Sequence, residues 1–275
     1  MVEAVPTNEA PRDSGTPSVP PAASGFDYSA IPSGYYDRVL RSGHPVRRLW
    51  HVSKFERVLD YLPPEGGGSI LDIGCFAGSF LSMVPRYRFE RQVGVDILPE
   101  QVAYATANHS SPFRSFRVVP SIYALRDLDE PFDCVTSIEV IEHLTPSEIR
   151  ALFRQLEHLV APGGRLVLTT PNYASAWPLI ELLLNKVSDV SYEEQHVTRF
   201  TYFDFEKKLE EIYPRVWSSF SLELKTTTHF LTPFLAGFSY EIARGLSRVV
   251  PHQTWRQPFG NLLLAVLTRS GPRSA

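Results

Sequence analysis

The feature that most constrains the fold is a glycine turn that directly follows a buried strand and leads into a helix. The apolar segment SILDIG predicts the strand, and the helix is expected from Ser79. Gly74 and Gly78 remove the Cβ atoms that would keep a ligand away from the backbone. The glycines do not follow the G-x-G-x-x-G spacing, which counts against a dinucleotide whose pyrophosphate sits on the helix N-terminus.

Two acidic residues accompany this turn. Asp72, beside it, would repel a phosphate but attract an ammonium group. Asp96 ends the next predicted strand, 22 residues after Gly74, where a carboxylate can accept both hydroxyl protons of a ribose. The ligand implied by these residues has a ribose, a cation and no phosphate.

Strand-like and helix-like blocks alternate along the middle of the chain, which predicts an α/β fold with parallel strands and crossover helices. The best-specified helix follows Thr145, because Thr145 and Glu148 form a capping box around Pro146. Gly163 and Gly164 are expected to end it, and another helix is expected from Thr201. The remaining predicted strands have the sequences RQVGVD, FRVVPS, CVTSIEV, RLVLTT, SLELKTT and LLLAVLT.

The chain is expected to hold one domain with additions. Residues 1–24 are rich in proline and predict a disordered tail, residues 25–65 a helical cap, and residues 66–270 the main domain. Insertions are expected at 173–200 and 229–258, with apolar core packing for the second. Both insertions carry aromatic residues suited to a sugar ring, a quinone or a lipid-linked acceptor: Tyr173, Trp177, Tyr192 and Phe200, then Phe230, Phe234, Phe238, Tyr240 and Trp255.

Composition narrows the function classes. Among 275 residues, 43% are hydrophobic and 21% charged, as in soluble globular proteins. The net charge of -3 gives no broad attraction to nucleic acid or an anionic membrane. Cys75 and Cys134 are expected to be buried thiols. Without a signal peptide or an apolar run of ~18 residues, the expected location is the cytoplasm.

The motifs together resemble the class I S-adenosylmethionine-dependent methyltransferases. The segment LDIGCFAGSF is similar to their first motif, PFDCVTSIEVIEHL to their fourth strand, and LVAPGGRLVLTTPN to the helix, turn and fifth strand that follow. The resemblance runs from about Gly68 to Leu209. Phe76 departs from it, because the family more often has glycine there. The resemblance implies a Rossmann-like doubly wound sheet of seven strands, mostly parallel with an antiparallel last strand.

The resemblance also implies which residues hold S-adenosylmethionine. The backbone near Asp72 and Gly74 would hold its methionine end, Asp96 its ribose and Ile97 one face of its adenine. The full expected set of cofactor-binding residues is Asp72, Gly74, Cys75, Gly78, Asp96, Ile97, Ser121, Ile122 and Glu139.

Glu139, Glu142 and His143 recur at helical spacing, which predicts that they converge on one face of a turn at the carboxyl edge of the sheet. His143 is then a candidate general base for an acceptor hydroxyl. Alternatively, these three residues and His196 bind a divalent cation, Mg, Mn or Zn, that acidifies the hydroxyl. A third interpretation is that Glu142 and His143 only cap the loop.

The metal interpretation is supported by a resemblance to ubiquinone-biosynthesis O-methyltransferases and small-RNA terminal 2′-O-methyltransferases. The catalytic candidates are Glu142, His143 and His196. The other histidines lack such neighbouring motifs and are interpreted as helix-face or loop residues: His44, His51, His109, His158, His229 and His252.

The expected function is therefore O-methylation of a small-molecule, sugar or lipid-linked hydroxyl. The alternatives are an N- or C-methyltransferase, or a nucleoside-binding subunit that turns nothing over. Nucleic acid is not the expected partner, and peripheral membrane contact stays open because the segment HFLTPFLAGF is strongly apolar.

Overall fold

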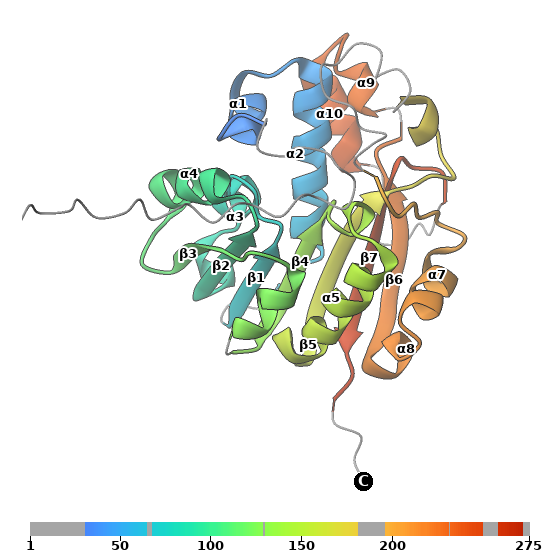
Figure 1. Ribbon diagram of the computed structural model, residues 1–275. Helices are drawn as coiled ribbons and strands as arrows, with labels where there is room; N and C mark the ends of the chain where they lie inside the picture. Colours follow the sequence, from blue (N-terminus) through green and yellow to red (C-terminus); the bar gives the residue numbers. More distant parts are fainter. Residues whose placement is uncertain are drawn as a thin grey trace, which may run out of the picture.

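Seven strands form a single sheet in the computed structural model, which describes residues 31–64, 68–128, 130–180, 196–230, 232–249 and 258–271 (Figure 1). The strand order is β3-β2-β1-β4-β5-β7-β6. The first five strands are parallel, and β7 is antiparallel to both β5 and β6. The predicted Rossmann-like α/β sheet is confirmed. The strands are β1 (Ser69–Ile73), β2 (Arg91–Asp96), β3 (Arg114–Val118), β4 (Phe132–Ile138), β5 (Val160–Pro171), β6 (Phe220–Thr228) and β7 (Leu262–Arg269).

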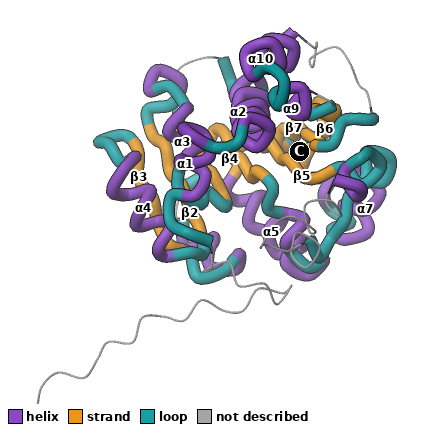
Figure 2. Tube along the Cα trace, turned by 90° about the horizontal axis from the view of Figure 1, so that it is seen from above, coloured by secondary structure: helices purple, strands orange, loops and turns teal. Residues whose placement is uncertain are grey.

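Helices cover both faces of this sheet (Figure 2). Apolar side chains of α5 and α7 pack on one face, and those of α2, α3 and α4 pack on the other. The α-helices are α1 (Tyr35–Ser42), α2 (Pro45–Asp60), α3 (Ser79–Met83), α4 (Pro99–His109), α5 (Pro146–Leu159), α7 (Phe205–Ile212), α8 (Val216–Ser219), α9 (Thr232–Leu235) and α10 (Tyr240–Val249). The 3-10 helices are η2 (Arg86–Arg88), η3 (Ile122–Asp127) and η4 (Ile141–His143).

Strand β1 shows why the chain forms this layered core. All of its residues are buried, as expected for a parallel strand covered on both faces. Ile70 belongs to the core beneath α2 and α3, whereas Leu71 and Ile73 belong to the core beneath α5. The carboxyl end of this strand is therefore held rigidly from both sides.

The capping box of α5 is confirmed. The Thr145 hydroxyl accepts the Glu148 N–H, and the Glu148 carboxylate accepts the Thr145 N–H. The predicted end of the helix is wrong, because α5 ends at Leu159 and strand β5 already begins at Val160, which pairs with Phe132. Gly163, with φ 76°, lies within the β5 segment instead.

Helix α7 also begins later than predicted. Thr201 and Asp204 form a local turn in which each side chain accepts the other's backbone N–H. Such side-chain to backbone bonds are favoured at helix N-termini and not inside helices. The helix therefore starts at Phe205.

The N-terminal helices are part of the main core, because Phe55 and Val58 of α2 pack with the residues of β1. Leu49, nearer the start of α2, packs against two alanines. Ala236 directly follows α9, and Ala243 lies in α10. The predicted tail at residues 1–24 lies outside the described residues, as do Tyr192 and Trp255 of the insertions. The predicted domain boundaries stay predictions.

Three further expectations concern cysteines, membrane spans and the second insertion. Cys75 and Cys134 are free and buried, as predicted. None of the helices in the described part of the chain combines the length and apolarity needed to span a bilayer. Core packing of the second insertion is only partly right, because Phe238 is 94% exposed and Ile242 is 65% exposed.

Candidate active site

The glycine turn after β1 is closed by two backbone hydrogen bonds. The N–H groups of Gly74 and Cys75 both donate to the Val95 carbonyl, at 2.9 and 3.0 Å. Gly74 has φ 78°, a left-handed conformation that side chains disfavour. A Cβ atom on Gly74 would lie 2.4 Å from Cγ2 of Val140. Glycine is therefore required here by the backbone and by a side chain from the segment after β4.

The next part of the turn contains the departure from the family motif. Phe76 has φ 48°, which is unusual for a bulky residue. Its N–H donates to the Asp96 carboxylate at 2.8 Å, and its ring contacts the Tyr36 ring of α1 at 4.9 Å. At Gly78, with φ 76°, a Cβ atom would lie 2.8 Å from the Phe116 ring. Contacts to α1, β2 and β3 thus hold the turn in its conformation.

Asp96 connects the end of β2 to this turn. One carboxylate oxygen accepts the Phe76 N–H, and the other accepts the Leu98 N–H at 2.9 Å. Burial raises the pKa of Asp96, although these backbone bonds oppose the rise. Each carboxylate oxygen has a second lone pair. The side chain can therefore organise the turn and still accept hydroxyl protons from a ligand.

Asp72 is the second acidic group near the turn, and it is 2% exposed. The Thr136 hydroxyl donates to it at 2.7 Å. Burial raises the pKa of Asp72 to about 7, with the Asp96 charge adding to the rise and the Thr136 hydrogen bond opposing it. A cationic ligand nearby would favour the ionised carboxylate.

The other expected cofactor residues lie at neighbouring strand ends. Ile97 follows β2, and Ser121 and Ile122 follow β3. The Val119 N–H donates to the Asp96 carbonyl at 2.9 Å, which keeps these two segments together. The set gathers at the carboxyl edge of the sheet, where open α/β sheets bind ligands. The individual roles stay predictions.

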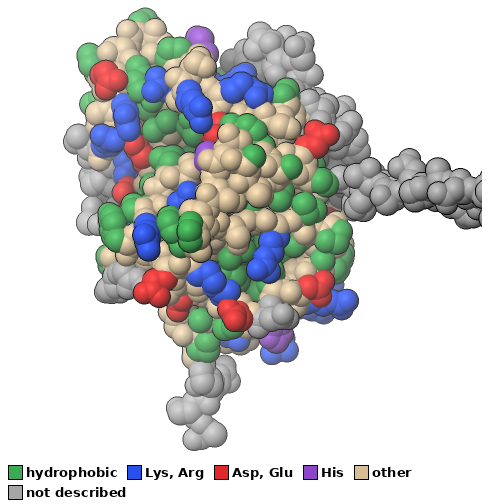
Figure 3. Space-filling view, turned by 90° about the vertical axis from the view of Figure 1, so that its left-hand side faces the viewer, with side chains coloured by type: hydrophobic (Ala, Val, Ile, Leu, Met, Phe, Trp, Pro, Cys, Tyr) green, Lys and Arg blue, Asp and Glu red, His purple; other side chains and the backbone are tan. Residues whose placement is uncertain are grey.

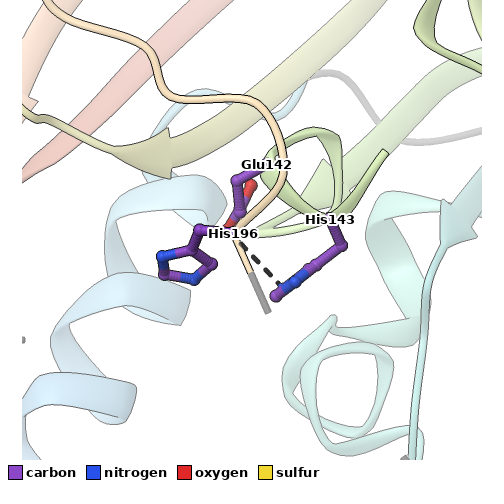
Figure 4. Close-up of side chains that lie close together, drawn as sticks. All are labelled: Glu142, His143 and His196. Carbon is purple, nitrogen blue, oxygen red and sulfur yellow. Dashed lines mark ion pairs between the residues drawn. The ribbon is translucent and has the colours of Figure 1, made fainter. Parts of the chain in front are cut away.

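Glu142, His143 and His196 form a cluster next to this edge (Figure 4). One ligand atom of each residue lies within 4.8 Å of the others. The Glu142 carboxylate is 4.0 Å from Nε2 of His143, and the rings of the two histidines are 5.2 Å apart. Nδ1 of His196 is 2.7 Å from the Tyr173 hydroxyl. Residues from the turn after β4 and from the chain before α7 thus meet, as predicted.

Glu142 is the most constrained group of the cluster, with no exposed surface. Within the described part of the chain, neither of its carboxylate oxygens has a hydrogen-bond partner. Burial, followed by the negative charge of Glu139, raises the pKa of Glu142 well above its usual value. A buried carboxylate without hydrogen bonds is costly unless a cation or proton compensates it.

Glu139 does not join the cluster. Its φ of 53° interrupts the helical spacing on which the predicted convergence was based. Its carboxylate forms an ion pair with Lys54 of α2. Although burial raises the pKa of Glu139, the charge and hydrogen bond of Lys54 lower it overall. No sequence signal singled out Lys54, which lies 85 residues away along the chain.

His229 follows β6 outside any helix or strand, in agreement with the loop interpretation, and it has close partners. Its Nε2 is 2.7 Å from the Trp50 carbonyl, and its ring lies 4.7 Å from the Trp50 ring. Burial lowers the pKa of His229 to about 4. Trp50 also contacts Trp177, which in turn lies 6.1 Å from His196. An aromatic surface thus extends from α2 to the cluster.

A comparison of the sequence with models of known protein families identifies the family of this chain. The model of the methyltransferase domain family matches residues 44–212, which include the glycine turn and the Glu142–His143 segment. The chain belongs to this family. The predicted class I S-adenosylmethionine-dependent methyltransferase is thereby confirmed as family and fold.

Two curated relatives are similar to part of this chain. The ubiquinone biosynthesis O-methyltransferase of Xylella fastidiosa is 30% identical over 53% of this chain and 57% of its own. The 2-methyl-6-phytyl-1,4-hydroquinone methyltransferase of Synechocystis is 35% identical over 50% of this chain and 46% of its own. The chain therefore spans about half the length of the curated relatives that it matches.

A solved structure shows the same fold. The magnesium protoporphyrin IX methyltransferase of Synechocystis, determined with bound S-adenosylhomocysteine, has a TM-score of 0.56 and 16% identity, and the match covers 86% of this chain and 93% of that one. The methyltransferase described here therefore shares its architecture with a protein that holds the cofactor product.

Proposed function

We propose that this methyltransferase transfers a methyl group from S-adenosylmethionine to a hydroxyl oxygen of a small-molecule, sugar or lipid-linked acceptor. The observation that carries the proposal is the contact between the two halves of the site. Val140, between Glu139 and the Glu142–His143 turn, fills the space left by the missing Cβ of Gly74. The cofactor turn and the acceptor cluster are thus adjacent.

The cofactor fits the residues at the strand ends. Gly74, Cys75 and Gly78 would present their backbone to its methionine end, with Asp72 as a counter-charge. Asp96 would accept the ribose hydroxyls, Ile97 would cover one adenine face, and Ser121 and Ile122 would lie at the adenine edge. When bound, S-adenosylmethionine supplies an electrophilic methyl group on a sulfonium that is a good leaving group.

Transfer requires the acceptor oxygen to lie in line with the breaking bond. The oxygen–carbon bond forms while the carbon–sulfur bond breaks, and sulfur takes the bonding electron pair. The hydroxyl proton leaves to His143 or to water. Without a metal in the cluster, His143, partly exposed beside buried Glu142, is placed to take it, whereas a metal-bound imidazole would leave that proton to water. Positioning accounts for most of the expected rate gain.

A divalent metal fits the cluster. Glu142 offers two buried oxygens that accept no hydrogen bond from the described residues, and His143 and His196 add imidazoles at compatible distances. Two imidazoles and one carboxylate are a donor set typical of catalytic zinc, and imidazole is a poorer ligand for Mg²⁺ than for Zn²⁺. A bound cation would acidify an acceptor hydroxyl and orient it.

The test is a calorimetric titration with S-adenosylhomocysteine, after chelation and again with Mg²⁺, Mn²⁺ or Zn²⁺, with NADH as control. Micromolar binding of S-adenosylhomocysteine without NADH binding supports S-adenosylmethionine as the cofactor. The double variant Glu142→Gln/His143→Asn should keep that binding and lose transfer. If the folded protein does not bind S-adenosylhomocysteine, the proposal is refuted.

Two other candidate functions make different predictions. An N- or C-methyltransferase would transfer to amines or carbanions without needing the cluster. A nucleoside-binding subunit would bind the cofactor and transfer to none of these acceptors. RNA ends are less favoured: on the face shown in Figure 3, basic side chains are scattered among acidic and apolar ones.

We also propose that a lipid surface is a partner, reached through the α9–α10 face. This face consists of the exposed apolar residues Phe234, Leu235, Phe238, Ile242 and Leu246. Arg248, which is also exposed, lies on the same helix and forms an ion pair with Glu56. Because α9 and α10 pack against α2, which carries Trp50, a lipid-linked acceptor could reach the site from this face.

The cytoplasmic location stays a prediction, which cell fractionation tests.

A further inference from the structure

Lys54 is a buried cation beside the candidate active site that the proposed mechanism does not use. Its side chain is 3% exposed, and its ion-pair partner is Glu139. The ammonium lies over two aromatic faces, 5.6 Å from the Tyr36 ring centroid and 5.3 Å from that of Phe55. A buried ammonium needs a paired carboxylate, because neither ring replaces its lost hydration.

Glu139 is fixed from its other side by the sheet. Its backbone N–H donates to the carbonyl of Thr169 in β5 at 3.0 Å and lies 3.1 Å from the Thr169 hydroxyl. Its carboxylate therefore meets Lys54 from an anchored position. Its neighbour Glu142, three residues later, is fully buried, and among the described residues no lysine or arginine forms an ion pair with it.

The two carboxylates of the segment thus have separate partners. Glu142 lies with His143 and His196 within 4.8 Å, and Glu139 is outside this group. If Glu139 moved to a metal in the cluster, it would leave the Lys54 ammonium buried without its counter-charge. Like charges next to each other would also oppose the binding of a metal close to that ammonium.

We propose that Lys54 holds Glu139 out of the cluster, so that a divalent cation has only Glu142, His143 and His196 as protein ligands. This inference rests on the proposed function of the same site. Lys54 acts as a positioning residue through Glu139. A site with three protein ligands keeps open positions for acceptor oxygens, as catalytic metal sites do.

The experiment is a Zn²⁺ titration of the full chain by calorimetry, for the wild type and matched variants. Glu142→Gln should weaken zinc binding about 10–100-fold, whereas the isosteric Glu139→Gln, which removes a nearby charge but no ligand, should weaken it by much less. Lys54→Met keeps the apolar stem but frees Glu139 as a fourth ligand, so it should tighten zinc binding about tenfold. The double variant Lys54→Met/Glu139→Gln should return to the wild-type value.

Equal losses in Glu139→Gln and Glu142→Gln would overturn the proposal, as would an unchanged affinity in Lys54→Met. If Lys54→Met does not fold, the comparison of the two glutamine variants decides. Failure of the wild type and Lys54→Met alike to bind zinc would also overturn it. In that case, retained binding of S-adenosylhomocysteine would leave the methyltransferase proposal intact.

Discussion

The contact between Gly74 and Val140 predicts a specific non-additive effect on stability. Gly74→Ala adds a methyl group whose carbon would lie 2.4 Å from Cγ2 of Val140, so the two groups must separate by about 1 Å. The left-handed backbone adds a cost of about 1–2 kcal/mol. Overpacking adds about 1–3 kcal/mol. We therefore expect the free energy of unfolding to fall by about 2–5 kcal/mol.

Val140→Ala removes the clashing atom and should by itself cost about 1 kcal/mol, because Val140 is only half-buried. In the double variant the new methyl group faces the remaining Cβ at 3.7 Å, an ordinary contact. The overpacking cost should then vanish while the backbone cost remains. The double variant should therefore be more stable than the sum of the single effects predicts, by about 1–3 kcal/mol.

The assay is urea denaturation of the four proteins of this cycle. Gly245→Ala is the control, because a Cβ there would meet none of the described residues within 4 Å, and it should stabilise α10 by up to about 1 kcal/mol. Additive single effects would refute the packing explanation. Methyl transfer by Gly74→Ala should fall about 100-fold, because a displacement of about 1 Å separates cofactor and acceptor groups.

Three more predictions concern the cofactor, pH and lipid. Asp96→Asn should weaken S-adenosylhomocysteine binding about 10–100-fold in calorimetry, because an amide offers only one acceptor oxygen. The control variant Asp127→Asn, at an exposed carboxylate, should not weaken this binding. Equal effects of the two variants would contradict the assignment of Asp96 to the cofactor. Because burial raises the pKa of Asp72 from 3.8 to about 7, the folded state retains a proton that the unfolded chain loses, and the free energy of unfolding should fall between pH 4 and 7 by up to about 4 kcal/mol. Urea denaturation across that range should show a shallower fall for Asp72→Asn, and parallel curves would refute this. Phe238→Ser/Ile242→Ser should reduce co-sedimentation with anionic phospholipid vesicles about tenfold or more, and undiminished binding would exclude the α9–α10 face.

The sheet was predictable from the sequence because its signals are local. Strand β1 is a short buried run bounded by a glycine turn, and α5 carries its own capping box. The end of α5 was not predictable from Gly163, because Val160 leaves the helix to pair with Phe132 of β4. Pairing with a neighbouring strand overrides the local stop signal.

The candidate site was predictable only in part, because its contacts span long stretches of chain. The Glu142–His143 pair follows from adjacent residues, and His196 from a family resemblance. Lys54 reaches Glu139 across 85 residues, and His229 reaches Trp50 across 179. No periodicity encodes such pairs, and the left-handed backbone of Glu139 breaks the helical spacing assumed for it.

The position of β7 between β5 and β6 has a consequence for the order of folding. Strand β5 and strand β6 do not pair with each other, since both form their ladders with β7, the last strand of the sheet along the chain. A nascent chain that has not yet produced Leu262–Arg269 already contains the whole cofactor turn but leaves two long strands with open edges. Such pairings across distant residues form slowly. This enzyme should therefore complete its sheet only after Leu262–Arg269 has been synthesised and has inserted between β5 and β6.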